Sequence, residues 1–217
     1  MNRTALAASL LATTLGLSAC SGIGDYTALT LTPEGDTFIA EGVVDGTTPD
    51  IMRNALQTHP EIKTVVLQYV PGSADDEANL EAARMLRANG MNTVVPSGGL
   101  VASGGTDLFL AGVTREIGPG ACLGVHSWAA GGITGFTEGK DVPKDDPQHQ
   151  LYLSYYDEMG IPQDFYWYTL DAADAENIHY MSNRELTQFG MATTPISSTA
   201  EATAASCEAV AAKYEFS

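Results

Sequence analysis

Basic side chains are scarce in this sequence of 217 residues, where 10 Lys and Arg stand against 27 Asp and Glu and give a formal net charge of −17. A negative field of this size repels phosphate groups, so the composition argues against nucleic-acid binding and against binding to anionic membrane surfaces. Aromatic residues are also few, at 8%, but hydrophobic residues make up 44%. The chain can therefore build one substantial core, and one domain is the expectation from its length.

The usual motifs of metal and nucleotide sites are missing. The four histidines, His59, His126, His149 and His179, are not paired with carboxylates at the spacing of metal ligands, so we expect no metal site. The glycine-rich loops contain neither a P-loop lysine nor the order Gly-x-Gly-x-x-Gly, so we expect no nucleotide and no other cofactor.

Only the N-terminus carries a long apolar run. Arg3 is the one charge in the first twenty residues, and the apolar stretch that follows ends in Leu-Ser-Ala-Cys at Cys20. The stretch is too short to span a bilayer comfortably, and it resembles a bacterial secretion signal that ends in a lipobox. The resemblance implies a signal peptide over residues 1–19 and a lipid, such as palmitate, on Cys20. It implies location in the bacterial periplasm, with Ser21 favouring the outer membrane. The alternative is an ordinary signal peptide with Cys20 as a free thiol.

Two further cysteines, Cys122 and Cys207, remain in the mature chain. An oxidising periplasm would permit them to form a disulfide. The alternative is two buried free thiols, because spacing in sequence does not reveal spacing in space.

After a Gly-, Thr- and Ser-rich linker over residues 20–36, strands and helices alternate along the chain. The β-branched run Thr64–Val70 predicts a strand buried on both faces, and the apolar spacing between Asp75 and Ala88 predicts a helix. Residues 37–44, 92–96 and 121–125 predict further strands, and residues 49–59 and 106–111 predict further helices. This alternation indicates an α/β domain over residues 37–217 with a mainly parallel sheet.

The C-terminal part differs because its pattern is mostly helical. Helices are predicted over residues 145–159, 163–168, 182–190 and 199–214. The first two hold most of the aromatic residues, which we interpret mainly as packing, with a substrate wall as the second interpretation. Glu185 follows Ser182 at the spacing of a capping box.

Three tight turns that follow buried strands carry polar groups, and sites in parallel sheets form at the carboxyl ends of strands. The turns are Pro71-Gly-Ser73, Ala102-Ser-Gly-Gly105 and Gly124-Val-His126. A serine at a helix start is surrounded by amides that can stabilise an oxyanion, and a histidine at a strand end can accept the serine proton. Taken singly, Ser103 is explained as a helix N-cap, Gly72 as a turn glycine and His126 as a core histidine.

In this order the three turns resemble the Clp protease and crotonase superfamily. The likeness covers about residues 38–194 and is strongest to a group of periplasmic proteins, with weaker likeness to signal-peptide peptidase A. It is carried by these segments: Phe109-Leu-Ala-Gly112, Arg115, Gly118-Pro119-Gly-Ala, Leu123-Gly-Val-His126-Ser-Trp128, Tyr155-Tyr156, Met159-Gly-Ile-Pro162 and Ile178-His-Tyr-Met181. The implied fold is the repeated ββα spiral of that superfamily, with a helical C-terminal part that closes over the site.

The resemblance also implies roles. It makes Ser103 the nucleophile, His126 its base, and the backbone amides of Ser73 and Gly104 the oxyanion hole. The third member of a Clp-type triad is an Asp, and here that place falls on Ile178 or Asn177. We take Asn177 as the third member, with Asp174 as the alternative. Asn177 can orient an imidazole but cannot stabilise its positive charge as a carboxylate does.

Two relatives imply other chemistry. A Ser-Lys dyad like that of signal-peptide peptidase A would need Lys140 or Lys144, but their segment is polar and a base lysine needs desolvation. An acyl-CoA enzyme would need a site for CoA phosphates, which the net charge opposes.

We therefore expect an envelope serine hydrolase that acts on a peptide or a small ester or amide through an acyl-enzyme on Ser103. The alternative function is a catalytically inactive lipoprotein of the same fold that binds a peptide or a partner protein, since fold does not fix function. The membrane contact would run through the lipid on Cys20, and the sequence leaves the formation of a homo-oligomer open.

Overall fold

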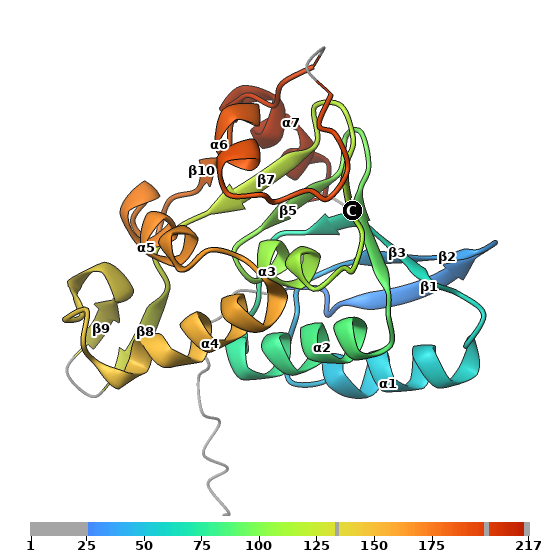
Figure 1. Ribbon diagram of the computed structural model, residues 1–217, viewed down its shortest axis with the longest axis horizontal. Coiled ribbons are helices and arrows are strands. Elements are labelled where there is room, and N and C mark those ends of the chain that lie inside the picture. The colour runs from blue at the N-terminus through green and yellow to red at the C-terminus, as the bar shows by residue number, and fades with distance from the viewer. Residues whose placement is uncertain (1–25, 133–134, 198–199, 215–217) are drawn as a thin grey trace, which may run out of the picture.

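The structure is a computed structural model that describes residues 26–132, 135–197 and 200–214. Within these residues the chain folds into one branched sheet covered by helices, with a small hairpin at one end (Figure 1). The strands of the main sheet are β1 (Thr30–Glu34), β2 (Thr37–Glu41), β3 (Thr64–Val70), β4 (Asn92–Val95), β5 (Leu100–Ala102), β6 (Arg115–Ile117), β7 (Cys122–Val125) and β10 (His179–Tyr180). The hairpin consists of β8 (Ala129–Gly132) and β9 (Gly135–Glu138).

The sheet runs in the order β1-β2-β3-β5-β7-β10 and branches at β3. The first residues of β3 pair with β4, which pairs onward with β6, whereas Tyr69 and Val70 at its end pair with β5. The pairings β2-β3, β3-β5 and β5-β7 are parallel, and the antiparallel pairings lie at the two edges, β1-β2 and β10-β7. The carboxyl ends of β3, β5 and β7 therefore point the same way.

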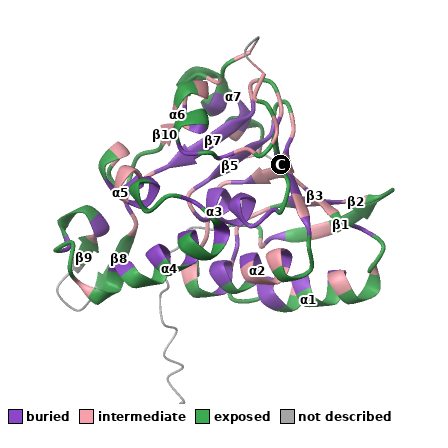
Figure 2. Cartoon of the chain, in the orientation of Figure 1, coloured by how far each residue is buried: buried purple, intermediate pink, exposed green. Residues whose placement is uncertain are grey.

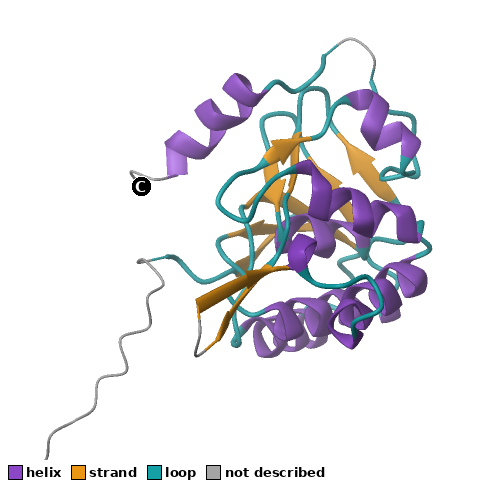
Figure 3. Ribbon diagram, turned by 90° about the vertical axis from the view of Figure 1, so that its left-hand side faces the viewer, coloured by secondary structure: helices purple, strands orange, loops and turns teal. Residues whose placement is uncertain are grey.

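Helices alternate with the strands, as the sequence predicts. The longer ones are α1 (Thr48–Thr58), α2 (Asp76–Ala88), α4 (Gln150–Met159), α5 (Gln163–Ala172) and α7 (Ala204–Tyr214), and the shorter ones are α3 (Gly104–Leu110), α6 (Asn183–Gln188) and the 3-10 turns Gly139–Asp141 and Pro147–His149. Helices α1 and α2 lie side by side along one face (Figure 1). Helix α7 lies on the opposite side of the sheet from the other helices (Figure 3).

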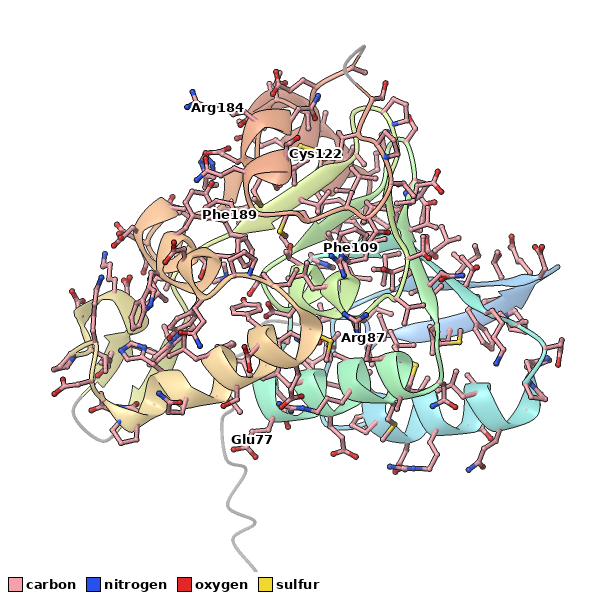
Figure 4. All side chains as sticks on the ribbon, in the orientation of Figure 1. Glu77, Arg87, Phe109, Cys122, Arg184 and Phe189 are labelled. Carbon is pink, nitrogen blue, oxygen red and sulfur yellow. A yellow bond between two sulfur atoms is a disulfide. The ribbon has the colours of Figure 1, made fainter. Side chains whose placement is uncertain are left out.

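Short α3 lies at the centre of the molecule, and each of its seven residues is buried (Figure 2). Phe109, labelled in Figure 4, is one of the largest fully buried side chains. The main core packs α3 together with β3, α2, α4 and α5, and a second small core packs α7 on the other face of β5 and β7. Because α3 is enclosed on all sides, the turn that begins it is held in place by the core.

The predicted fold class, an α/β domain with a mainly parallel sheet, is the one that the structure has. The predicted linker over residues 20–36 is wrong in its last part. Residues 30–34 form β1 rather than coil, because the two-residue turn Gly35-Asp36, with Gly35 at φ 61°, pairs them with β2 in a hairpin. The predicted signal peptide and Cys20 lie outside the described residues. Among the residues that the structure describes, none of the helices is long and apolar enough to cross a membrane.

Candidate active site

Ser103 occupies a strained turn between β5 and α3. Its backbone angles are φ 51° and ψ −129°, and it is the one non-glycine residue with positive φ in the described part of the chain. Conformations of this kind cost about 1–3 kcal/mol for a residue with a side chain and persist only where the surrounding structure enforces them. Within the same residues, the Ser103 hydroxyl makes no hydrogen bond, so the turn is not held by the serine side chain acting as a helix cap.

Two glycines let α3 approach the neighbouring chain closely enough to enforce this turn. A Cβ on Gly104 would lie 2.4 Å from Ser73 Oγ, and a Cβ on Gly105 would lie 1.9 Å from the carbonyl oxygen of Val70. Both positions therefore require glycine. The start of α3 is pressed against the end of β3 and the turn that follows it.

That turn, Pro71-Gly-Ser73, lies directly beside the serine, since a Cβ on Gly72 would be 3.5 Å from Ser103 Cβ. Val44 binds one side of the turn, donating its N–H to the Gly72 carbonyl at 3.0 Å and accepting the N–H of Ala74 at 2.7 Å. Successive groups of an extended chain point to opposite sides, so the N–H of Ser73 points away from Val44. This amide and that of Gly104, the first of a helix, are free to bind an anion in the described structure.

His126 directly follows β7, and two hydrogen bonds connect its strand to the turn. The N–H of Ser103 donates to the Gly124 carbonyl at 3.0 Å, and Thr106 Oγ1 donates to the same oxygen at 2.8 Å. Ala102 pairs with Gly124, so Ser103 and His126 each lie just beyond the last paired residues of adjacent strands. Adjacent strands are about 4.8 Å apart.

The four predicted residues Ser73, Ser103, Gly104 and His126 line one cavity of about 130 Å³. The cavity lies between the carboxyl ends of the strands and the two helices that carry most of the aromatic residues. Its other lining residues are Asp76, Thr106, Asp107, Val125, Trp128, Ala129, Tyr152, Tyr156, Phe165, Tyr166 and Thr169.

The imidazole of His126 is half-buried, and this burial lowers its pKa below the ordinary 6.5. A backbone interaction with Ser127 and the charges of Asp76 and Glu138 oppose part of the shift. The imidazole is therefore neutral near pH 7, which is the form that accepts a proton.

The predicted third member of the triad does not reach His126. Nδ1 of His126 is buried and has no hydrogen-bond partner among the described residues. Asn177 is exposed, and the exposed carboxylate of Asp174 forms an ion pair with Lys140. Ile178 lies instead beside β7, the strand that leads to His126, since its Cγ2 would be 2.5 Å from a Cβ on Gly124. No hydrogen bond joins Ser103 to His126 in this part of the chain either, although hydrogen bonds of unliganded active sites are often long.

The alternative lysines lie outside the cavity. Lys140 pairs with Glu138 and Asp174, and Lys144 lies over the ring of Trp167, with Nζ 4.9 Å from its centroid. No group of three or more potential metal-ligating side chains is found in the described residues.

Sequence reasoning missed two cavity carboxyls, Asp76 and Asp107. Asp76 falls at the start of one predicted helix and Asp107 within another, and neither was singled out. A signal for Asp107 was available, because it follows Ser103 by four residues and so lies on the same face of α3. The aromatic residues were interpreted mainly as packing, yet Tyr152, Tyr156 and Tyr166 also line the cavity.

Cys122 and Cys207 form a disulfide with a Cα–Cα distance of 5.7 Å (Figure 4, where Cys122 is labelled). The bond ties α7 to β7, the strand that leads to His126. It closes a loop between residues 85 positions apart.

The chain is similar in fold to several solved structures. A membrane-bound stomatin-specific protease, 1510-N, has a TM-score of 0.49 and 12% identity over 69% of this chain and 73% of that chain. The same protease in complex with a substrate peptide has a TM-score of 0.46 and 13% identity over 67% of each chain. An enoyl-CoA hydratase from Polaromonas sp. JS666 has a TM-score of 0.44 and 13% identity, covering 88% of this chain and 77% of that chain.

No family model and no curated protein matches this chain. Since these TM-scores lie below 0.5, the comparisons carry no argument about the chemistry of this chain.

Proposed function

We propose that this protein is a serine hydrolase that cleaves an amide or ester bond, with a peptide of the cell envelope as the substrate class. The observation that carries the proposal is the strained backbone of Ser103 at the start of α3. Ser103 lies in one cavity with His126, Ser73 and Gly104, and the N–H groups of the last two have no partner in the described residues. Strain of this kind is typical of functional positions, and a serine on a sharp turn from strand to helix presents its hydroxyl to a substrate.

The reaction follows from these groups. The Ser103 oxygen attacks the substrate carbonyl carbon while the neutral imidazole of His126 accepts the hydroxyl proton. The carbonyl oxygen becomes an oxyanion, which the N–H groups of Ser73 and Gly104 bind. The imidazolium then gives its proton to the leaving amine or alcohol, and the bond to the leaving group breaks. Water, deprotonated by the same imidazole, hydrolyses the acyl-enzyme and frees Ser103.

Without a carboxylate partner, His126 acts as the base of a dyad. An imidazolium that no anion stabilises is a weaker catalyst, so this site should turn over more slowly than a full triad. The charges of Asp76 and Glu138 favour the imidazolium, because they oppose the lowering of the His126 pKa by burial.

The test is covalent labelling of the purified protein with a fluorophosphonate probe at pH 8. We expect stoichiometric labelling of Ser103, none in Ser103→Ala and strongly reduced labelling in His126→Ala. Ser154→Ala is the matched control, because Ser154 is an exposed serine on α4, and it should label like the wild type. A well-folded wild-type protein that the probe does not label would refute the hydrolase proposal.

A second candidate function is binding without turnover. One observation favours it: Nδ1 of His126 is buried and has no hydrogen-bond partner in the described part of the chain. In that case the cavity would hold a peptide or a segment of a partner protein. Absence of labelling, together with saturable binding of peptides by Ser103→Ala, would support this candidate.

We also propose that the chain is exported and held at the membrane through a lipid on Cys20. The sequence of residues 1–20 supports this, by its likeness to lipoprotein signals. Metabolic labelling with palmitate tests it, because incorporation should be lost in Cys20→Ala, and incorporation that persists in this variant would contradict it.

A further inference from the structure

The cavity beside Ser103 has the size of one side chain and aromatic walls. Its volume of about 130 Å³ compares with about 150 Å³ for an engineered cavity that holds benzene. The rings of Trp128, Tyr152 and Tyr166 follow one another at centroid distances of 6.4 and 5.7 Å, with 15° between successive planes. Aromatic rings attract cations, and the attraction grows when water is excluded.

Two carboxyl groups line the same cavity. Oδ1 of Asp107 accepts the Tyr156 hydroxyl at 2.7 Å. Asp76 accepts the hydroxyls of Ser73 and Tyr152, each at 2.5 Å and each on a different oxygen. All three donors are neutral, so hydrogen bonds orient both carboxyls but leave their negative charge uncompensated.

Asp107 is buried, which disfavours its negative charge. Desolvation raises the pKa of Asp107 to about 7, the Tyr156 hydrogen bond opposes the rise, and the charge of Asp76 adds to it. Buried carboxylates are ordinarily paired with a cation. Among the described residues, neither Asp107 nor Asp76 has such a cationic partner in the cavity.

The described residues supply no positive charge to the cavity. None of the described residues that line the cavity is Lys or Arg, and His126, the one basic group there, has a lowered pKa. The arginines of the surrounding helices are engaged elsewhere: Arg84 binds Glu158, and Arg87 binds the carbonyls of Leu110 and Met159.

We propose that this cavity selects a substrate with a cationic side chain, a primary ammonium on an alkyl stem, on the residue whose carbonyl Ser103 attacks. The inference rests on the proposed hydrolase function and names its substrate class. The alkyl stem lies against the aromatic rings, and the ammonium lies between Asp107 and Asp76. The ligand thereby brings the positive charge that buried Asp107 and half-buried Asp76 lack.

The experiment compares two substrates that differ only in this charge, the thiobenzyl esters of N-acetyl-lysine and N-acetyl-norleucine. We expect kcat/KM to favour the lysine ester by about tenfold or more, the size of a hydrogen-bonded contact to a buried charge. In Asp107→Asn and in Asp76→Asn the preference, measured as the ratio of the two kcat/KM values, should fall toward equality.

Asp164→Asn is the matched control, because Asp164 is an exposed residue of α5, the helix that carries Phe165 and Tyr166. It should keep the wild-type preference. A loss of preference in Asp164→Asn as large as in Asp107→Asn would overturn the inference, since general surface charge would then explain it. If Asp107→Asn fails to fold, protection of wild-type Ser103 from the fluorophosphonate decides instead: n-butylammonium should protect and 1-butanol at the same concentration should not.

Failure of this inference and failure of the proposed function give different results. Labelling of Ser103 together with equal rates for the two esters overturns the cation preference and leaves the hydrolase in place. If Ser103 is not labelled at all, the hydrolase proposal fails, and the preference is tested by binding to Ser103→Ala, followed through the fluorescence of Trp128. Tighter binding of n-butylammonium than of 1-butanol then supports the cavity's preference, and equal binding overturns it.

Discussion

The strained backbone of Ser103 gives a stability prediction that is opposite in sign to the usual effect of glycine. At φ 51° alanine keeps the strain of a Cβ, about 1–3 kcal/mol, whereas glycine removes it. Glycine also gives the unfolded chain more freedom, which costs about 0.4–1 kcal/mol. The midpoints of these two ranges differ by about 1.3 kcal/mol, with limits of about 0 and 2.6 kcal/mol, and the difference favours Ser103→Gly over Ser103→Ala in the free energy of unfolding.

Both variants lose the hydroxyl, and in the described residues that hydroxyl makes no hydrogen bond, so its loss does not enter the comparison. For a chain of this size, 1 kcal/mol shifts the midpoint of thermal unfolding by about 2–4 °C. We therefore expect Ser103→Gly to melt a few degrees above Ser103→Ala, measured by circular dichroism under identical conditions.

Ser154 on α4 provides the internal control, because it is exposed and helical. There Gly should be less stable than Ala by about 1 kcal/mol, the ordinary helix propensity. If Gly is the less stable substitution at both positions, the backbone of Ser103 is not strained in solution, and the main support for its role as nucleophile is lost.

Two further predictions follow from His126 and from the disulfide. Because burial lowers the pKa of His126 and the neutral imidazole is the active form in the proposed reaction, the rate of fluorophosphonate labelling should fall to half its maximum only below pH 6.5. A half-maximal rate above pH 6.5 would contradict this, and His126→Ala should show no such inflection. The disulfide closes a loop between residues 85 positions apart, which in the chain-entropy estimate stabilises the fold by about 4–5 kcal/mol. Reduction should therefore lower the urea midpoint of the wild type strongly and leave that of Cys122→Ser/Cys207→Ser unchanged; a wild type that reductant does not shift would refute the estimate.

Local sequence signals were sufficient where each element's own residues decide its structure. The β-branched run Thr64–Val70 forms β3 with the predicted bounds, and Ser182 and Glu185 form the predicted capping box. The glycines around Ser103 were recognised as a tight turn, although its φ could not be read from the residues.

Contacts between distant segments decided what the sequence could not predict. Strands β5 and β6 have three residues each and are strands only because they pair with neighbours in the sheet. The prediction of Asp174 as an alternative partner for His126 failed for the same reason. Asp174 binds Lys140, which lies 34 residues earlier in the chain, and no local pattern indicates that ion pair. Asp107 was missed because a single acid on a helix does not indicate a site by itself. Only the packing of α2 and α4 against α3 places Asp76 and the tyrosines in the same cavity.

The carbonyl of Gly124 receives both the N–H of Ser103 and the hydroxyl of Thr106, so the serine turn is fastened to the same strand that ends in the imidazole. A thermal displacement of that strand carries the turn along with it. The separation between Ser103 and His126 is consequently less sensitive to motion of the sheet than the position of either residue in the molecule. Fluctuations at the edges of the sheet therefore have little effect on the distance between these two residues.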